Sequence, residues 1–266
     1  MDAIVVGLAV VLGLVTGSFA NVPIHRWPRG GTVTSPKRSA CPACETSIAP
    51  RDNVPVVSWL LLRGRCRHCD APIAPRYAVV EFVTAALFGL IAWRWGVDPL
   101  LPALLVFTWA LVVATAIDLE HRIIPNRLTY RLPFVLLPLV VLDAALAGAW
   151  GDLRRAVIWA IGVPAIMFAM AELFRLLRGK MGMGMGDVKL AVSIGLVVGY
   201  LGGIHLVVFA YATMATSIVV VVVLLLARRA QLASRIPFGP YLAVGALVPV
   251  LAPDASADLV RRVLGL

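Results

Sequence analysis

Charged side chains are scarce in this sequence, because Asp, Glu, Lys and Arg make up only 14% of its 266 residues. Soluble domains contain roughly 25% of these residues. Hydrophobic residues make up 61%, the mean hydropathy is +0.92, and long apolar runs follow one another along the chain. The scarcity of charge excludes a soluble globular domain and predicts an all-α polytopic membrane protein.

Acidic residues are the scarcer charged class, with 14 Asp and Glu against 24 Lys and Arg, which gives a formal net charge of +10. Nucleic-acid-binding proteins carry a similar excess of positive charge. In a membrane protein the excess is better explained by cytoplasmic loops that are rich in Lys and Arg. We therefore expect the lipid bilayer as a partner, and no nucleic acid.

Eight apolar runs are candidate membrane spans. The sixth and eighth are short for a hydrocarbon core about 30 Å thick, so we expect them to be tilted, extended into flanking residues or shielded by protein. The predicted spans are 3–22, 79–95, 100–117, 132–150, 156–177, 190–203, 204–227 and 238–251.

The distribution of basic residues predicts the orientation of these spans. Nineteen of the 24 Lys and Arg residues follow odd-numbered spans, so those loops are predicted to be cytoplasmic and both termini to lie outside. The first apolar run has the flanks of a retained span, not of a removable signal peptide. We expect a first transmembrane helix at 1–22, a small cytoplasmic domain at 23–78 and a membrane domain at 79–266.

Cysteine is scarce and confined to one segment, where two C-x-x-C pairs are separated by 21 residues. The spacing of Cys41, Cys44, Cys66 and Cys69 is typical of a tetrahedral zinc site. A segment as small as 23–78 usually needs a metal or disulfides to fold. Two disulfides or unreactive thiols are the alternatives, and a reducing cytoplasm disfavours disulfides. Because four thiolates leave no open position on the metal, the predicted zinc is structural.

Two isolated acids are predicted to meet at the cytoplasmic surface. Asp118 ends the third predicted span and Asp187 precedes the sixth, so topology places them at the same depth although 69 residues separate them. A pair of carboxylates that shares a proton can perform aspartic hydrolysis. Alternatively, Asp118 pairs with Arg122 on one helix, and Asp187 pairs with Lys189 or caps the sixth span. Glu120 is the nearest rival to Asp118.

A glycine-rich stretch leads into the second acid. Gly182, Gly184 and Gly186 stand at alternate positions before Asp187, and such glycines let another chain approach the backbone closely. The alternative is a flexible loop whose acid is merely solvated. The short motif is a weak signal when it is taken alone.

Taken together, the motifs resemble those of the bacterial type IV prepilin peptidases, a family of polytopic G-x-G-D aspartic proteases. The resemblance implies that Asp118 and Asp187 are the catalytic aspartates. Two departures, Ala78 where proline is frequent and Asn126 where aspartate is frequent, replace no catalytic acid. The matching stretches are 17–22, 41–44, 52–60, 63–69, 76–81, 117–126, 184–190 and 236–240.

The resemblance also implies a substrate, a second activity and a location. Family members cleave the leader of prepilins or pseudopilins after a glycine, in the bacterial inner membrane. Long members with a cysteine-bearing loop also methylate the new N-terminus, with S-adenosylmethionine as the methyl donor. Gly184, Gly186 and Lys189 are predicted to bind the substrate.

Two other classes of function remain open at this stage. A proton-coupled transporter would use paired acids, but it usually places polar groups near the middle of the bilayer. A scaffold for pilus or secretion assembly would use the zinc loop for binding, and two intact aspartates argue only weakly against it.

Overall fold

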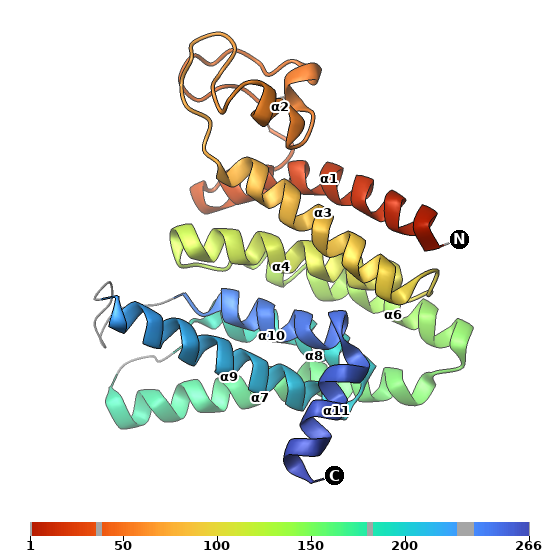
Figure 1. Ribbon diagram of the computed structural model, residues 1–266. Helices are drawn as coiled ribbons and strands as arrows, with labels where there is room; N and C mark the ends of the chain where they lie inside the picture. The colour runs from red at the N-terminus through yellow and green to blue at the C-terminus, as the bar shows by residue number, and fades with distance from the viewer. Residues whose placement is uncertain (1, 36–38, 180–182, 228–236, 266) are drawn as a thin grey trace. The chain divides into compact units, whose positions relative to one another are not determined.

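The computed structural model describes residues 2–35, 39–179, 183–227 and 237–265 (Figure 1). Within these ranges the regular secondary structure is helical, apart from two isolated antiparallel bridges, Ala40 with Ser47 and Arg65 with Pro72. The prediction of an all-α protein is therefore confirmed. The chain divides into two compact units, Met1–Val97 and Asp98–Leu266.

The first unit is built on two long helices that lie side by side (Figure 1). Close packing is possible because Gly13 has no side chain: a Cβ atom there would lie 2.6 Å from the Cα atom of Ala85. Asn21 Nδ2 also donates a hydrogen bond to the carbonyl oxygen of Tyr77, at 3.2 Å. The elements are α1 (Asp2–Arg26), the 3-10 helices Trp27–Arg29 and Pro50–Asn53, α2 (Val57–Leu61) and α3 (Arg76–Trp95).

The second unit is a bundle in which α8 is the most enclosed long helix, with twelve of its 17 residues buried. It packs along α7, where a Cβ atom on Gly195 would lie only 2.0 Å from the carbonyl oxygen of Trp159. The helices are α4 (Leu101–His121), α5 (Asn126–Thr129), α6 (Leu132–Ala147), α7 (Trp150–Arg178), α8 (Met185–Leu201), α9 (Gly203–Leu226), α10 (Gly239–Leu251) and α11 (Pro253–Leu264).

Six helical segments of the described chain are long and apolar enough to span a membrane. A bent pair, α10 with α11 at 103°, would make a seventh. The predicted sixth span corresponds to α8, which is shielded by protein, and the eighth corresponds to α10 of this bent pair. The six segments are Ala3–Arg29, Arg76–Trp95, Leu101–His121, Asn126–Ala147, Trp150–Arg178 and Gly203–Leu226.

Large aliphatic side chains cover the outer faces of these segments. Examples are Ile161 on α7 and Val219 on α9, which are 69% and 59% exposed. Such surfaces need hydrocarbon around them, so the chain is a multi-pass membrane protein. Of the motif residues, Gly182 and Ile236 lie outside the described ranges.

Candidate active site and four-cysteine centre

Asp118 lies in the last turn of α4, where its side chain is buried. The helix continues to His121 and ends at Arg122, which adopts a left-handed conformation with φ of 55°. The predicted pairing with Arg122 is not the contact that the structure gives to Asp118. Its Oδ2 atom accepts a hydrogen bond from the backbone N–H of Gly239, at 2.9 Å.

Asp187 lies in the first turn of α8 and is also buried. Gly184 precedes the helix in an extended conformation, and the backbone N–H of Asp187 donates to its carbonyl oxygen at 3.1 Å. The carboxylate folds back toward this glycine, since a Cβ atom on Gly184 would lie 3.0 Å from Asp187 Oδ2. The other oxygen, Oδ1, is buried and has no hydrogen-bond partner among the described residues.

The two carboxyl groups lie close enough for the charge of Asp118 to act on the carboxyl group of Asp187. The structure thus brings together the two acids that topology predicted to meet. Glu120, two residues beyond Asp118, points elsewhere: it is exposed and lies 3.8 Å from His121 Nε2. An arrangement of two buried, mutually interacting carboxyls can hold one proton between them.

The segment after α4 is tied to the start of α8. A Cβ atom on Gly186 would lie 3.0 Å from Ile124 Cβ and 3.2 Å from its carbonyl oxygen, so only glycine fits there without displacement. Lys189 Nζ donates to Asn126 Oδ1 at 2.8 Å and lies 4.9 Å from the ring centroid of Tyr130. Gly186 and Lys189, both predicted to bind substrate, therefore contact the protein's own α4–α6 connection.

The far end of α8 is held by polar contacts as well. Arg155 of α7 donates to the carbonyl oxygens of Gly199 and Tyr200 at 3.0 and 3.1 Å, which satisfies groups at the helix C-terminus. The hydroxyl of Tyr200 donates to Asp143 of α6 at 2.5 Å. The helix that carries Asp187 is thus fixed to its neighbours at both ends.

In the first unit, the four cysteines converge. Their sulfur atoms all lie within 4.8 Å of one another, and none forms a disulfide. The Sγ atoms of Cys41 and Cys69 are 3.8 Å apart. Two thiolates at about 2.3 Å from a tetrahedral zinc ion would be separated by about 3.8 Å. The cluster therefore fits a zinc ion, and the four thiols are free in this structure rather than paired in disulfides.

Local backbone geometry explains why these thiols converge. Each pair of cysteines sits on a tight turn closed by backbone hydrogen bonds, for example from Glu45 to Cys41 at 2.8 Å and from Asp70 to Cys66 at 3.0 Å. Glu45 and Asp70 have positive φ angles of 57° and 55° in these turns. Hydrogen bonds with Thr46 lower the pKa of Cys44 to about 6, whereas the pKa of Cys69 is raised, because burial and the neighbouring thiols outweigh a backbone hydrogen bond from Ala71.

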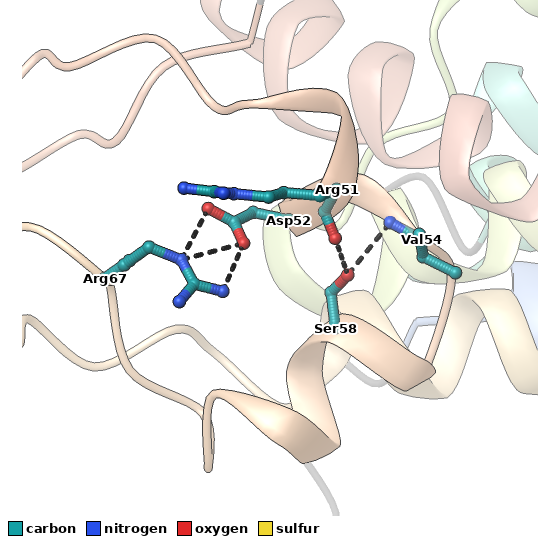
Figure 2. Close-up of polar contacts among 5 residues, drawn as sticks. All are labelled: Arg51, Asp52, Val54, Ser58 and Arg67. Atoms are coloured by element: carbon teal, nitrogen blue, oxygen red, sulfur yellow. Dashed lines mark hydrogen bonds and ion pairs between the residues drawn. The ribbon is translucent and has the colours of Figure 1, made fainter.

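An ion pair connects the second cysteine pair to the neighbouring loop (Figure 2). Arg67 contacts both carboxylate oxygens of Asp52, with its shortest N–O distance at 2.7 Å. The Arg67 guanidinium holds the pKa of Asp52 below its ordinary value. Ser58 of α2 accepts a hydrogen bond from the N–H of Val54 and donates one to the carbonyl oxygen of Arg51. The cysteine centre, the 3-10 turn and α2 are thus linked.

Sequence reasoning missed the role of Gly239. The motif at 236–240 was noted only as part of the resemblance, and no function was predicted for any of its residues. A usable signal was present, however. Gly239 is followed by Pro240 and an apolar run, a pattern that starts a helix and leaves its first N–H free to bind an anion.

Comparison with known proteins places the chain in a family. The profile of the bacterial peptidase A24 N-terminal domain matches residues 11–95, and that of the type IV leader peptidase family matches residues 105–233. A protein from Pseudomonas aeruginosa named prepilin leader peptidase/N-methyltransferase is 35% identical over 92% of this chain and 89% of its own length. Proteins of the same name from Aeromonas hydrophila (36%, covering 93% and 91%) and Neisseria gonorrhoeae (34%, covering 94% and 91%) are similar. No solved structure matches the chain. The chain belongs to the type IV leader peptidase family.

Proposed function

We propose that this protein is a membrane aspartic endopeptidase that cleaves the leader of type IV prepilins or pseudopilins and then methylates the new N-terminus. The observation that carries the peptidase assignment is the meeting of two buried carboxyls, Asp118 and Asp187, in a member of this family. The methyltransferase assignment rests on the names of the relatives, and S-adenosylmethionine is the proposed methyl donor. No residue of this chain is assigned to the methyl donor.

Hydrolysis of a peptide bond needs one ionised and one protonated carboxyl. Asp118 is the proposed base. Its Oδ2 accepts a hydrogen bond from the N–H of Gly239 and lies at the positive end of the α10 helix dipole. The hydrogen bond and the dipole both favour the ionised carboxylate. Asp187 is the proposed acid. It also sits at a helix start, but its Oδ1 is buried and meets no hydrogen-bond partner in the described part of the chain, and such an oxygen favours the neutral form.

In the proposed reaction, the Asp118 carboxylate takes a proton from a water molecule, and the water oxygen attacks the scissile carbonyl carbon. Asp187 donates its proton to the carbonyl oxygen as negative charge develops there. The tetrahedral intermediate then collapses: Asp118 gives the proton that it took from water to the leaving amine, the C–N bond breaks, and a hydroxyl of the intermediate returns a proton to Asp187 as the carbonyl re-forms. Gly184 is the glycine at which a substrate backbone would approach Asp187, because it is exposed and extended at the helix start.

The zinc loop is proposed to have a structural role on the cytoplasmic side. Cys41, Cys44, Cys66 and Cys69 would hold the ion and leave no position for a substrate. The excess of Lys and Arg in the loops after odd-numbered predicted spans supports an inner-membrane protein whose acid-bearing loops face the cytoplasm. This placement fits a prepilin leader that enters from that side.

The decisive experiment presents purified protein with a prepilin and S-adenosylmethionine and reads the product by mass spectrometry. Wild-type protein should give a shortened chain that carries one added methyl group. Asp118→Asn and Asp187→Asn should each abolish cleavage while the protein stays folded, because an amide cannot carry the proton. Glu120→Gln is the matched control, an exposed acid two residues away, and should cleave nearly normally.

Three results would defeat the assignment. Near-normal cleavage by either aspartate variant would show that the wrong acids were chosen. Absence of cleavage by wild-type protein, combined with proton flux that depends on both aspartates, would favour the transporter. If neither cleavage nor flux were seen, the scaffold alternative would stand.

A further inference from the structure

Helix α2, in the loop that carries the cysteines, exposes an apolar face. Leu60 and Leu61 are 61% and 77% exposed, and Val57 is 49% exposed. Nothing in the proposed peptidase or methyltransferase chemistry uses these side chains. An exposed apolar group of this kind in a short, ordered segment usually marks a contact surface.

The orientation of this face is fixed, because the opposite side of α2 is bonded to the rest of the unit. Ser58 is buried and is held by Val54 and Arg51 (Figure 2). The indole N–H of Trp59 donates to the carbonyl oxygen of Ile73 at 3.1 Å. These bonds hold α2 against the rest of the unit, while Leu60 and Leu61 remain exposed.

A further hydrogen bond fixes the position of α2 beside the first turns of the membrane helix α3. The backbone N–H of Val56 donates to Glu81 Oε2 at 2.7 Å, and Glu81 is a buried residue in the second turn of α3. Helix α3 is a candidate span that begins at Arg76. The start of α2 is therefore held beside the end of a span, which is where the hydrocarbon core gives way to the headgroups.

An apolar hollow of about 230 Å³ lies between α2 and the start of α3. Val56 and Leu60 line it from the side of α2, and Val79 and Phe82 line it from α3. Phe82 is 62% exposed on this candidate span, so the α3 side of the hollow is a lipid-facing surface. The apolar face of α2 continues that surface.

Basic residues follow directly after the apolar face. Arg63 and Arg65 are both exposed, whereas Arg67 is engaged by Asp52. The whole segment 23–78 carries nine Lys or Arg residues against three acids. Apolar side chains beside arginines are the combination that binds an anionic lipid surface.

We infer that α2 and the arginines after it form a docking surface for the anionic phospholipid leaflet from which α3 emerges. Leu60, Leu61 and the hollow receive acyl chains, and Arg63 and Arg65 contact the phosphates. This docking would hold the cysteine-bearing loop against the membrane. It depends on neither aspartate, so it stands or falls independently of the proposed peptidase activity.

The first test measures hydrogen exchange of residues 54–67 in the full-length protein, reconstituted in nanodiscs. Phosphatidylcholine alone is compared with phosphatidylcholine mixed with phosphatidylglycerol. Exchange should be slower in the anionic discs. Each of Arg63→Gln and Arg65→Gln should reduce the preference for anionic lipid about fivefold, since one basic residue near the surface contributes about 1 kcal/mol. Arg51→Gln is the charge-matched control and should leave the preference in place.

The second test identifies what covers α2. Leu61 is replaced by the photocrosslinking residue benzoylphenylalanine, and Ile48, an exposed apolar residue outside α2, receives the same replacement as a control. Irradiation should attach phospholipid at position 61 and much less at position 48. Adducts at position 61 to another part of the chain or to a second copy would overturn the inference. Equal exchange in the two disc types would also overturn it, as would an equal effect of Arg51→Gln.

Discussion

Replacing Gly239 with alanine tests whether the backbone of α10 holds the base of the peptidase. An added Cβ atom would lie 2.8 Å from Asp118 Oδ2 and 3.3 Å from both Cβ and Cγ of the same residue. Contacts under 3.0 Å are not tolerated, so the carboxylate or the start of α10 must move. The 2.9 Å hydrogen bond from the Gly239 N–H would lengthen or break.

The size of the effect follows from that bond. A hydrogen bond to a charged group contributes about 1.5–3 kcal/mol, and about 1.4 kcal/mol corresponds to a tenfold change in rate. We therefore expect kcat to fall roughly 10- to 150-fold, with KM for the prepilin little changed, because Gly239 contacts Asp118, the proposed base, and has no proposed contact with the substrate. If Asp118 is the base, the acid limb of the pH–rate profile should also move to higher pH.

The assay follows leader cleavage of a prepilin at saturating concentration and across pH. Gly203→Ala is the matched control in the same unit, because a Cβ atom there would meet nothing within 4 Å. Folding is checked by thermal unfolding in the same detergent. A folded Gly239→Ala protein with the wild-type kcat and pH profile would refute the reasoning about Gly239, even if Asp118→Asn had lost all cleavage.

The remaining predictions concern the zinc loop, the Lys189 contact and the second activity. Cys41→Ser should lower bound zinc from one ion per chain and make the 23–78 loop sensitive to protease, because the metal supplies much of the folding free energy of so small a piece; full zinc content by metal analysis would contradict this. Asn126→Asp should convert the hydrogen bond with Lys189 into an ion pair and raise the unfolding temperature slightly, whereas Lys189→Met should lower both that temperature and kcat. Asp187→Asn should still methylate a pilin that has already been cleaved, and failure to do so in a folded, zinc-loaded protein would indicate that the two activities share a site.

The helices were largely predictable because apolar runs record the thickness of the bilayer. The limits of that reasoning appear at α8, where hydropathy predicted a span at 190–203 and the helix begins at Met185. Its first residues include Gly186 and Asp187, and a span predicted from apolar residues alone does not extend over a glycine and an acid. The start of α7 was missed for a similar reason. Its first turns contain Arg155, a charged residue whose hydrogen bonds go to the end of α8.

The cysteine cluster was predictable because its information is local. Each C-x-x-C turn brings its own pair of sulfurs together, so the fold then has only to bring the two turns into contact. The meeting of Asp118 and Asp187 was predictable from topology, because both acids stand at helix ends on one side of the membrane. In both cases the side chains that come together are visible in the sequence as unusual residue types in an apolar setting.

Gly239 shows where sequence reasoning of this kind stops. Its contribution is a backbone N–H, which every residue except proline possesses, so no residue type marks it. Glycine is required because the carboxylate of Asp118, 121 residues earlier in the chain, occupies the space of a side chain. That constraint exists only after α4 and α10 have packed together. The same holds for Gly186, which faces the backbone of Ile124 and was predicted to face a substrate. A glycine beside a catalytic acid therefore has two readings in a sequence, close approach of a substrate or close approach of the protein itself, and packing decides between them.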